Sequence, residues 1–282
     1  MRTSICIASL GLVLAVGFCG CSGTHMQSNP SPASSAPAHI VIVVEENHSY
    51  SEIIGSPAAP YINSLATQGA LFTQSFGISH PSQPDYLALF SGSTQGITDD
   101  SCPHTFSASS LESELISAGK TFTGYSEGLP QAGSSACSTG EYARKHVPWT
   151  DFSQDQANDN QPFSSFPSDF TRLPLVSFVI PDLLDDMHDG SIQQGVAWLK
   201  SNLSAYVVWA MNNNSALIVT WDEDDGTDNN QVATVFVGGA IKPGQYSETI
   251  SHYSVLRTIE NLYGLPALAN AVNAAPITDV WK

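Results

Sequence analysis

The sequence predicts an α/β fold, a three-layer sandwich in which a mostly parallel central sheet carries helices on both faces. Apolar runs of strand length alternate along the chain with segments of helical spacing, which is the pattern of parallel strands joined by helical crossovers. Several of these runs are continuously apolar, as strands buried on both faces are. The chain has 282 residues, of which 42% are hydrophobic, enough for one large core. We therefore expect a single folded domain over residues 39–282.

The first strand is expected at residues 39–47, where a continuous apolar run ends in acidic side chains. A helix is expected at residues 84–92, because Pro84 suits a first helical turn and Gly92 suits a helix end. The same reasoning places the other elements. The other strands are expected at 70–77, 121–127, 175–182, 216–223 and 231–239, and the other helices at 59–69, 110–120, 191–213 and 251–264.

Residues 1–21 have the pattern of a secretory signal peptide. Arg2 precedes an apolar run at 5–18 that is too short for a comfortable membrane span. The Gly-Cys pair ending at Cys21 resembles a bacterial lipoprotein signal, although the Phe-Cys pair before it departs from that pattern. We expect an exported protein with a lipid on Cys21; the alternative is ordinary cleavage nearby.

Residues 22–38 are rich in Ser, Pro and Ala and contain no aromatic or branched apolar residues. Such a composition cannot bury enough apolar area to fold, so a disordered linker is expected. If Cys21 is acylated, the linker tethers an outer or cell-surface membrane lipoprotein. Otherwise the product is secreted or periplasmic.

Removal of the signal leaves Cys102 and Cys137 as the cysteines of the domain. In an exported protein we expect them to pair, and the disulfide would contribute roughly 3–4 kcal/mol by restricting the unfolded chain. Two separate buried thiols are the alternative. Metal binding by the pair is disfavoured because no CxxC spacing is present.

The chain is strongly acidic, with 26 Asp and Glu residues against 9 Lys and Arg residues and a formal net charge of −17. Such a surface repels nucleic-acid backbones and anionic membranes at long range. Nucleic-acid binding is therefore not expected, and membrane association would depend on the lipid at Cys21. An anionic substrate would require local positive charge from a metal ion, histidines or helix ends.

Three predicted strands end in polar side chains that could meet at one edge of the sheet: Glu46 with Asn47, Asp182, and Asp222 with Glu223. Ligands of open parallel sheets bind beyond this edge. Any one of these ends alone fits the start of a solvated loop. Together they would repel one another unless a cation lay among them. Oxygen ligands of this kind favour a divalent metal ion.

Histidines accompany the acidic strand ends. A single loop histidine is as often an exposed or capping residue as a ligand or catalyst. Four lie in loops beside the elements just described: His80, His146, His188 and His252.

Ser82 lies just before Pro84, so its hydroxyl is expected at a helix N-terminus among free backbone N–H groups. This is the arrangement of an anion site that contains a hydroxyl. The alternative is that Ser82 is only the N-cap of the helix, a frequent role of serine.

Taken together, five motifs resemble the bacterial phosphoesterase family that contains secreted acid phosphatases and phospholipases C. The likeness spans residues 39–281 and is strongest to the shorter secreted acid phosphatases, some of which act on phosphatidylinositol 3-phosphate. The motifs are EENHSY (45–50), HPSQPDYLALFSGS (80–93), PDLLDDMHDG (181–190), TWDEDDG (220–226) and SHYSVLRTIENLYG (251–264). The wider relation is to the alkaline phosphatase superfamily, so an alkaline-phosphatase-like sandwich is implied. Asp85 departs from the superfamily pattern, in which Asn is commoner.

The resemblance implies a divalent metal ion of unspecified identity and a phosphate ester substrate. It makes Ser82 the nucleophile, which forms a phosphoserine intermediate, and we choose His188 to protonate the leaving oxygen. Asp224 and Asp225 are then expected to lie on a solvated loop. The implied metal ligands are Glu46, Asn47, Ser82, Asp222 and Glu223, and the implied phosphate-binding histidines are His80, His146 and His252. Cationic imidazoles would favour activity below neutral pH.

Three functions are therefore compared. A metal-dependent phosphate monoesterase of acid-phosphatase type is the leading hypothesis. A phosphodiesterase or phospholipase C uses the same chemistry and differs in substrate. A non-catalytic, metal-binding surface lipoprotein would leave the Ser82 hydroxyl without a role. The sequence does not address the oligomeric state.

Overall fold

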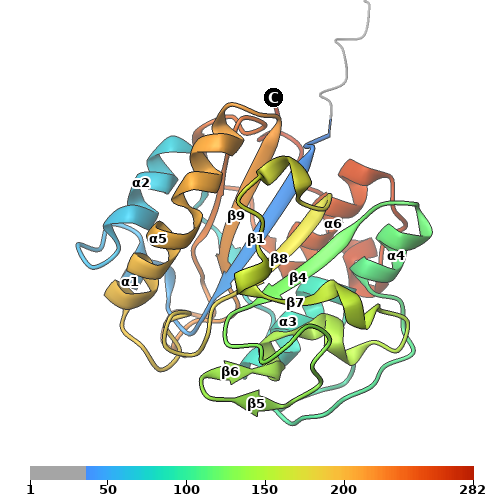
Figure 1. Ribbon diagram of the computed structural model, residues 1–282. Coiled ribbons are helices and arrows are strands. Elements are labelled where there is room, and N and C mark those ends of the chain that lie inside the picture. The colour runs from blue at the N-terminus through green and yellow to red at the C-terminus, as the bar shows by residue number, and fades with distance from the viewer. Residues whose placement is uncertain (1–35) are drawn as a thin grey trace, which may run out of the picture. The chain divides into compact units, whose positions relative to one another are not determined.

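The computed structural model describes residues 36–282 and is built around an eight-stranded sheet of order β11-β2-β10-β9-β1-β8-β4-β7 (Figure 1). The strands are β1 (His39–Glu45), β2 (Ala70–Phe72), β4 (Phe122–Ser126), β7 (Asn160–Pro162), β8 (Val176–Ile180), β9 (Ser215–Trp221), β10 (Thr234–Val237) and β11 (Gly244–Tyr246). Two small sheets pair β3 (Ser75–Phe76) with β12 (Ile250–Ser251) and β5 (Ser138–Thr139) with β6 (Tyr142–Ala143).

The main sheet is mostly parallel, as predicted. Strand β10 alone runs antiparallel to its neighbours β9 and β2, and the other adjacent pairs are parallel. At the centre, Val43 of β1 lies opposite Val219 of β9 and Val179 of β8. All three side chains are fully buried, which is why these strands read as continuous apolar runs.

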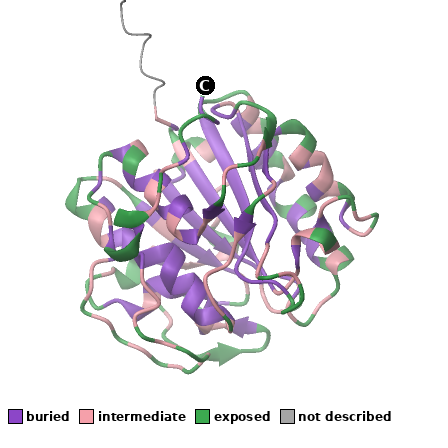
Figure 2. Cartoon of the chain, turned by 180° about the vertical axis from the view of Figure 1, so that it is seen from behind, coloured by how far each residue is buried: buried purple, intermediate pink, exposed green. Residues whose placement is uncertain are grey.

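Helices cover both faces of the sheet and complete the three layers (Figure 1). One face carries α1 (Tyr50–Ile53), α2 (Pro60–Gln68) and α5 (Ile192–Met211), and the other carries α3 (Ser82–Ser91), α4 (Leu111–Ser117) and α6 (His252–Tyr263). Because successive strand residues point to opposite faces, Val41 and Val43 pack toward α5, whereas Ile42 and Val44 pack toward α3 and α6. Figure 2 shows that the buried residues concentrate in the sheet and the inner helix faces.

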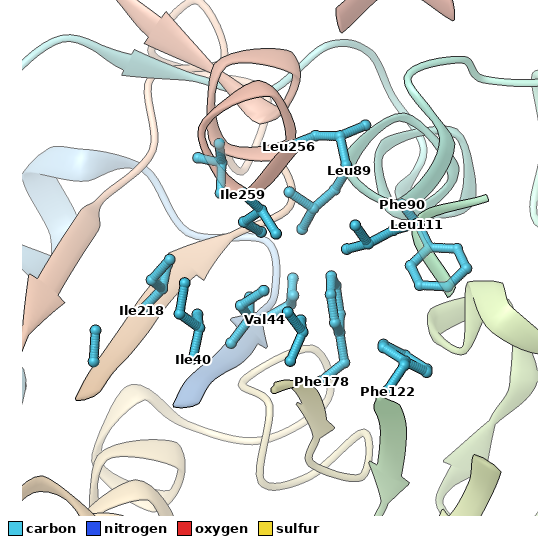
Figure 3. Packing of buried hydrophobic residues seen from close by; sticks show 14 of the residues in the cluster. Ile40, Val44, Leu89, Phe90, Leu111, Phe122, Phe178, Ile218, Leu256 and Ile259 are labelled. Atoms are coloured by element: carbon cyan, nitrogen blue, oxygen red, sulfur yellow. The ribbon is translucent and has the colours of Figure 1, made fainter. Parts of the chain in front are cut away.

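The core on the α3 side is dominated by aromatic and branched side chains (Figure 3). Phe90 of α3 meets Phe178 of β8 edge to face, with ring centroids 5.6 Å apart, a favoured aromatic geometry. Leu89 of α3 and Leu256 of α6 close the layer between the two helices. This packing fixes the position of α3, whose first turn lies at the edge of the sheet where β1 and β9 end.

Helix α3 ends where the sequence predicts. Gly92 has φ of 70°, the left-handed conformation that favours glycine at a helix end. A Cβ at this position would lie 2.2 Å from the Leu268 carbonyl oxygen, so glycine is also required by the close approach of the two chain segments.

The structure differs from the sequence prediction mainly in short elements. The strand predicted at 70–77 divides into β2 and β3, because β3 leaves the main sheet to pair with β12. Strands β5, β6, β7, β11 and β12 and helix α1 are too short to show a clear period. The 3-10 helices are η1 (Arg144–His146), η2 (Pro148–Asp151), η3 (Ala157–Asp159), η4 (Phe163–Ser165), η5 (Phe170–Arg172) and η6 (Ala269–Asn273).

Cys102 and Cys137 form the predicted disulfide, which joins the segment after α3 to the start of the β5–β6 hairpin across 35 positions of sequence. Within residues 36–282, no helix has the length and apolar character needed to cross a membrane. The predicted signal peptide and the lipidation of Cys21 lie outside the described residues. Of the predicted linker, residues 36–38 are described, and the Pro37 carbonyl accepts a hydrogen bond of 3.0 Å from the Tyr263 hydroxyl.

Candidate active site

The carboxyl ends of β1 and β9 and the first turn of α3 meet at one edge of the sheet. Glu46 and Asn47 follow β1 directly, and Asp222 and Glu223 follow β9. Ser82 is the first residue of α3 and is 1% exposed. The structure thus brings together the five residues predicted to hold a metal ion.

The Ser82 hydroxyl lies between two carboxylates. Its Oγ is 2.9 Å from Glu46 Oε2 and 3.0 Å from Glu223 Oε1, and its single proton can be donated to either. Pro81 is the N-cap of α3, so Ser82 does not serve as the capping residue. A buried hydroxyl within hydrogen-bond distance of two carboxylates is placed for deprotonation.

The carboxylates themselves are crowded and buried. One oxygen from each of Glu46, Asp222 and Glu223 lies within 4.8 Å of the others. Burial and the neighbouring carboxylate charges raise the pKa of Glu46 and of Asp222 well above their ordinary values. Asp222 Oδ2 is buried without a hydrogen-bond partner. These features fit a divalent cation, which would neutralise the carboxylates and give the unpaired oxygen a partner.

Asn47 adds a fourth group to this set. It adopts a positive φ of 52°, and its backbone N–H donates to Asp222 Oδ1 across 3.3 Å. One end of its amide lies 3.3 Å from Glu46 Oε2 and 3.1 Å from Glu223 Oε1. As NH₂ that end donates to both carboxylates, and as oxygen it joins an all-oxygen ligand set for a cation.

His146 lies behind the carboxylates. Its Nε2 is 3.1 Å from Glu46 Oε1 and its Nδ1 is 3.3 Å from Asp186 Oδ2. Burial lowers the pKa of His146 well below its ordinary value, and the nearby Lys145 and His188 lower it further. This direction disfavours the cationic imidazole expected at His146. The buried ring lies between the Glu46 and Asp186 carboxyl groups.

Tyr86 also supports Glu46 and was not singled out from the sequence. Its hydroxyl donates to Glu46 Oε1 across 2.5 Å, and its ring stacks on His146 with centroids 4.9 Å apart. The sequence signal is its position: Tyr86 follows Ser82 by four residues, so both side chains lie on one face of α3.

His80 lies at the open side of the site, with its side chain 46% exposed. Its Nδ1 contacts Glu223 Oε2, and its Nε2 is 3.2 Å from Asp224 Oδ1. Asp224 was expected on a solvated loop, and this expectation is wrong: Asp224 is 2% exposed. Its carboxylate accepts the backbone N–H groups of Gly226, Asp228 and Asn230 and so folds the loop upon itself. Asp225 is exposed as expected.

His252 begins α6 and faces the protein interior. Its Nε2 lies 2.5 Å from the Asp222 carbonyl oxygen and 3.4 Å from Asp85 Oδ1. Asp85, the departure from the superfamily pattern, accepts the backbone N–H groups of Ile78 and Ser79. These contacts connect the end of β9 to α3 and to the loop that carries His80.

His188 approaches the site from the loop after β8, and Lys145 approaches it from the 3-10 helix η1. The His188 backbone N–H donates to Asp186 Oδ1 across 2.8 Å, and His188 Nδ1 lies 2.8 Å from Asp189 Oδ1. Lys145 Nζ lies 3.2 Å from His188 Nε2 and 2.8 Å from Asp100 Oδ2. Sequence reasoning missed Lys145, although it adjoins His146 in the sequence.

Asp100 changes the expectation for the start of α3. Free backbone N–H groups were expected there, but the Gln83 N–H donates to Asp100 Oδ1 across 3.0 Å. The positive end of α3 is therefore partly neutralised by Asp100, whose other oxygen binds Lys145. Lys145 provides local positive charge at this edge.

Asp182 does not join the Glu46 group, contrary to the expectation that three strand ends converge. It lies with Glu127 and Asp185 in a separate group. The reason is local: the Asp182 carboxylate accepts the backbone N–H groups of Leu184 and Asp185 and thereby turns the chain after β8. Asp186, four residues later, is the residue of this loop that reaches His146.

Comparison with protein families matches residues 56–266, more than half of the chain, to the Phosphoesterase family. A phosphatidylinositol-3-phosphatase from Mycobacterium tuberculosis is 57% identical over 254 residues, which cover 88% of this chain and 85% of that protein. An acid phosphatase from Aspergillus fumigatus is 29% identical over 237 residues, 77% of this chain. The chain spans only 53% of that fungal protein.

Solved structures share the fold at low sequence identity. A protein in the alkaline phosphatase superfamily from Vibrio parahaemolyticus has a TM-score of 0.58 at 13% identity, covering 87% of this chain and 71% of that chain. The lipoteichoic acid synthase LtaP from Listeria monocytogenes has a TM-score of 0.59 at 11% identity, covering 83% of this chain and 73% of that chain. The predicted alkaline-phosphatase-like sandwich is confirmed as the fold.

Proposed function

This chain belongs to the Phosphoesterase family, and on that premise we propose that it is a metal-dependent phosphate monoester hydrolase of acid-phosphatase type with Ser82 as its nucleophile. The observation that carries the proposal is the Ser82 hydroxyl, buried at the start of α3 and within 3.0 Å of two carboxylates. A binding protein has no need of a hydroxyl in this position.

Glu46, Asn47, Ser82, Asp222 and Glu223 are the residues that would hold the metal ion. When bound, a divalent cation would act as a Lewis acid, stabilising charge on the phosphoryl group and lowering the pKa of an adjacent hydroxyl. The crowding of these carboxylates and the unpaired Asp222 Oδ2 support the assignment.

In the first step Ser82 Oγ attacks phosphorus in line with the leaving oxygen. Its proton passes to Glu46 or Glu223, the two carboxylates that already accept its hydrogen bond. The bond from phosphorus to the leaving oxygen breaks, and His188 supplies a proton to that oxygen. In the second step water attacks the phosphoserine and gives a proton to His188. The bond from phosphorus to Ser82 Oγ breaks, phosphate leaves, and the Ser82 oxygen regains the proton held by Glu46 or Glu223.

The remaining groups hold the substrate and the catalytic side chains. Lys145 stays cationic: burial acts to lower its pKa, but Asp100 and Glu46 more than offset this and raise it. We assign it to a phosphoryl oxygen, whose negative charge it would balance in the bound substrate and in the transition state alike. His80, on the exposed side of Glu223, is placed to contact an entering phosphate. His146 and His252 are assigned to positioning Glu46 and Asp222.

We extend the proposal to phosphoinositide substrates, because the Mycobacterium tuberculosis relative named phosphatidylinositol-3-phosphatase covers nearly the whole chain. The diesterase hypothesis is not favoured, since the relatives just described are named as phosphatases.

The test is hydrolysis of p-nitrophenyl phosphate and bis(p-nitrophenyl) phosphate, each with and without a chelator. The proposal expects cleavage of the monoester and loss of this activity with chelator. Cleavage of the diester alone would favour the phospholipase hypothesis. Failure to cleave either ester under a series of divalent metals would favour the binding lipoprotein.

A second arm addresses the substrate. Phosphate release from phosphatidylinositol 3-phosphate and from phosphatidylinositol 4-phosphate in mixed micelles is compared at equal concentration. Preference for the 3-phosphate supports the phosphoinositide assignment, and release from neither lipid alongside cleavage of p-nitrophenyl phosphate would contradict it.

A further inference from the structure

A second group of carboxylates lies where β4 and β8 end. Glu127 follows β4, and Asp182 and Asp185 lie in the turn after β8. One oxygen from each lies within 4.8 Å of the others. All three side chains are partly exposed, so an ion from solution can reach them.

The turn is already organised around these carboxylates. Glu127 Oε2 accepts the Asp182 backbone N–H across 3.1 Å, and Asp182 Oδ1 accepts the Asp185 N–H across 3.2 Å. Asp185 Oδ1 accepts a hydrogen bond from Gln194 of α5 across 3.1 Å. The backbone and α5 therefore hold the acidic side chains in place before any ligand arrives.

Glu45 provides an independent observation. It is fully buried, and neither of its carboxylate oxygens has a hydrogen-bond partner. A buried carboxylate without a partner is costly unless something nearby compensates it.

The strand register directs Glu45 toward the same group. Val43 pairs with Val179 of β8, and Ser126 pairs with Ile180, so Glu45 and Glu127 lie at the carboxyl ends of the two strands on either side of β8. Glu45 is two residues after Val43 and shares its face of the sheet, the face that carries α5. Glu46 points to the opposite face, toward α3. The two acidic groups thus lie on opposite faces of the sheet.

No basic side chain neutralises this second group: among residues 36–282, Glu45, Glu127, Asp182 and Asp185 make no ion pair with Lys, Arg or His. We propose that Glu127, Asp182 and Asp185 bind a second divalent cation of the calcium class, with Glu45 on its inner side. Oxygen-only ligands in an irregular, half-exposed arrangement suit Ca²⁺ better than Zn²⁺ or other metals that prefer nitrogen or sulfur.

The site would act on the loop that follows β8. A cation bound to Asp182 and Asp185 fixes the chain immediately before Asp186 and His188, which reach the candidate active site. The inference goes beyond the proposed function, because binding of this ion requires no catalysis.

The test uses the full chain carrying Glu46→Gln and Asp222→Asn, which disable the first ligand set, so failure of the proposed function cannot affect it. Ca²⁺ binding is measured by equilibrium dialysis, and the melting temperature is measured with and without Ca²⁺ at about 5 mM, above the weakest affinities of extracellular calcium modules. Mg²⁺ at the same concentration is the comparison ion.

We expect one bound Ca²⁺ per chain and a rise in melting temperature that Mg²⁺ does not reproduce. Adding Asp185→Asn should weaken Ca²⁺ binding at least about tenfold, because one ligand charge is lost. Asn can still accept the Gln194 hydrogen bond, so the fold is retained. Asp279→Asn, at an exposed acid elsewhere, is the matched control and should leave binding unchanged.

The alternative is that Glu127 and Asp185 share a proton and bind no ion. In that case Ca²⁺ leaves the folded background variant unchanged, and Asp185→Asn alters only its stability. Either that result or equal Ca²⁺ affinity with and without Asp185→Asn overturns the proposal. Glu127→Gln provides a second variant if Asp185→Asn does not fold.

Discussion

Lys145 Nζ lies 3.2 Å from His188 Nε2, so a lysine ammonium faces one ring nitrogen of the histidine assigned as the general acid. His188 Nδ1 faces Asp189. A lysine donates only, so in this arrangement Nε2 accepts and the ring proton lies on Nδ1, toward Asp189. When a phosphoryl oxygen replaces Nε2 as the partner of Lys145, Nε2 becomes free to carry the proton for the leaving group.

Lys145→Met should raise KM for a phosphate monoester at least about tenfold, with a smaller effect on kcat. The variant loses a positive charge that contacts the phosphoryl group in the bound substrate and in the transition state alike. KM should also become less sensitive to ionic strength. Steady-state kinetics at several salt concentrations measures both. The exposed Lys200→Met is the control and should match wild type. An unchanged KM in Lys145→Met would remove Lys145 from substrate binding.

His188→Gln should slow hydrolysis most for substrates whose leaving oxygen must be protonated. General acid catalysis is worth about 10²–10⁴-fold when the leaving oxygen needs a proton, so kcat for an alkyl phosphate should fall by that factor. The kcat for p-nitrophenyl phosphate, whose leaving group is a stable anion, should fall much less. An equal loss with both substrates would indicate that His188 has a different role.

Tyr86→Phe should weaken metal binding about 10- to 100-fold, as loss of a supporting hydrogen bond to a metal ligand typically does. The Tyr86 hydroxyl donates to Glu46 across 2.5 Å, and phenylalanine keeps the ring that stacks on His146. Metal titration of the apoprotein, followed by activity, gives the affinity. Activity at saturating metal should recover, whereas an affinity equal to wild type would contradict a supporting role.

The protein should lose several kcal/mol of stability as pH rises from about 5 to 9. Burial raises the pKa of Glu112 from 4.5 to about 9 and that of Asp155 from 3.8 to about 7. The folded state therefore holds protons that the unfolded state has released. The stability gained from these bound protons disappears as pH rises through the folded-state pKa values of Glu112 and Asp155. Urea unfolding at several pH values measures this slope.

Glu112→Gln tests the source of that slope. Gln stays neutral and can still accept the Gln156 N–H, which Glu112 Oε1 binds across 2.6 Å. The loss of stability between pH 5 and 9 should become smaller. Glu114→Gln on the same helix is the matched control and should keep the wild-type slope. Identical slopes in wild type and Glu112→Gln would exclude Glu112 as the titrating group.

Much of the fold and part of the site could be predicted from local patterns. Continuous apolar runs identify the buried strands, and the acids that end β1 and β9 must emerge at the same edge of a parallel sheet. Pro84 identifies the first turn of α3 and hence the place of Ser82. These inferences need only the periods of strands and helices and the preferences of individual residues.

Other features depend on contacts that no local pattern contains. Asp224 reads as a solvated acid, yet the turn at 226–230 supplies three backbone donors that allow its burial. Lys145 lies on a 3-10 segment with no strong period, and its position depends on Asp100 from a different loop. The separation of Asp182 from the Glu46 group follows from the turn after β8, whose direction the sequence does not specify.

The central claim is that Ser82 becomes phosphorylated during turnover. The most direct measurement is mass spectrometry of the protein quenched in acid during hydrolysis of a phosphate monoester, followed by mapping of the modified peptide. We predict one added phosphoryl group on Ser82 in the wild type. Ser82→Ala should show none and should lack turnover while retaining the wild-type circular dichroism spectrum. Ser91→Ala, at the other end of α3, is the control and should be phosphorylated on Ser82 like the wild type. A Ser82→Ala variant that still hydrolyses the monoester would contradict the account.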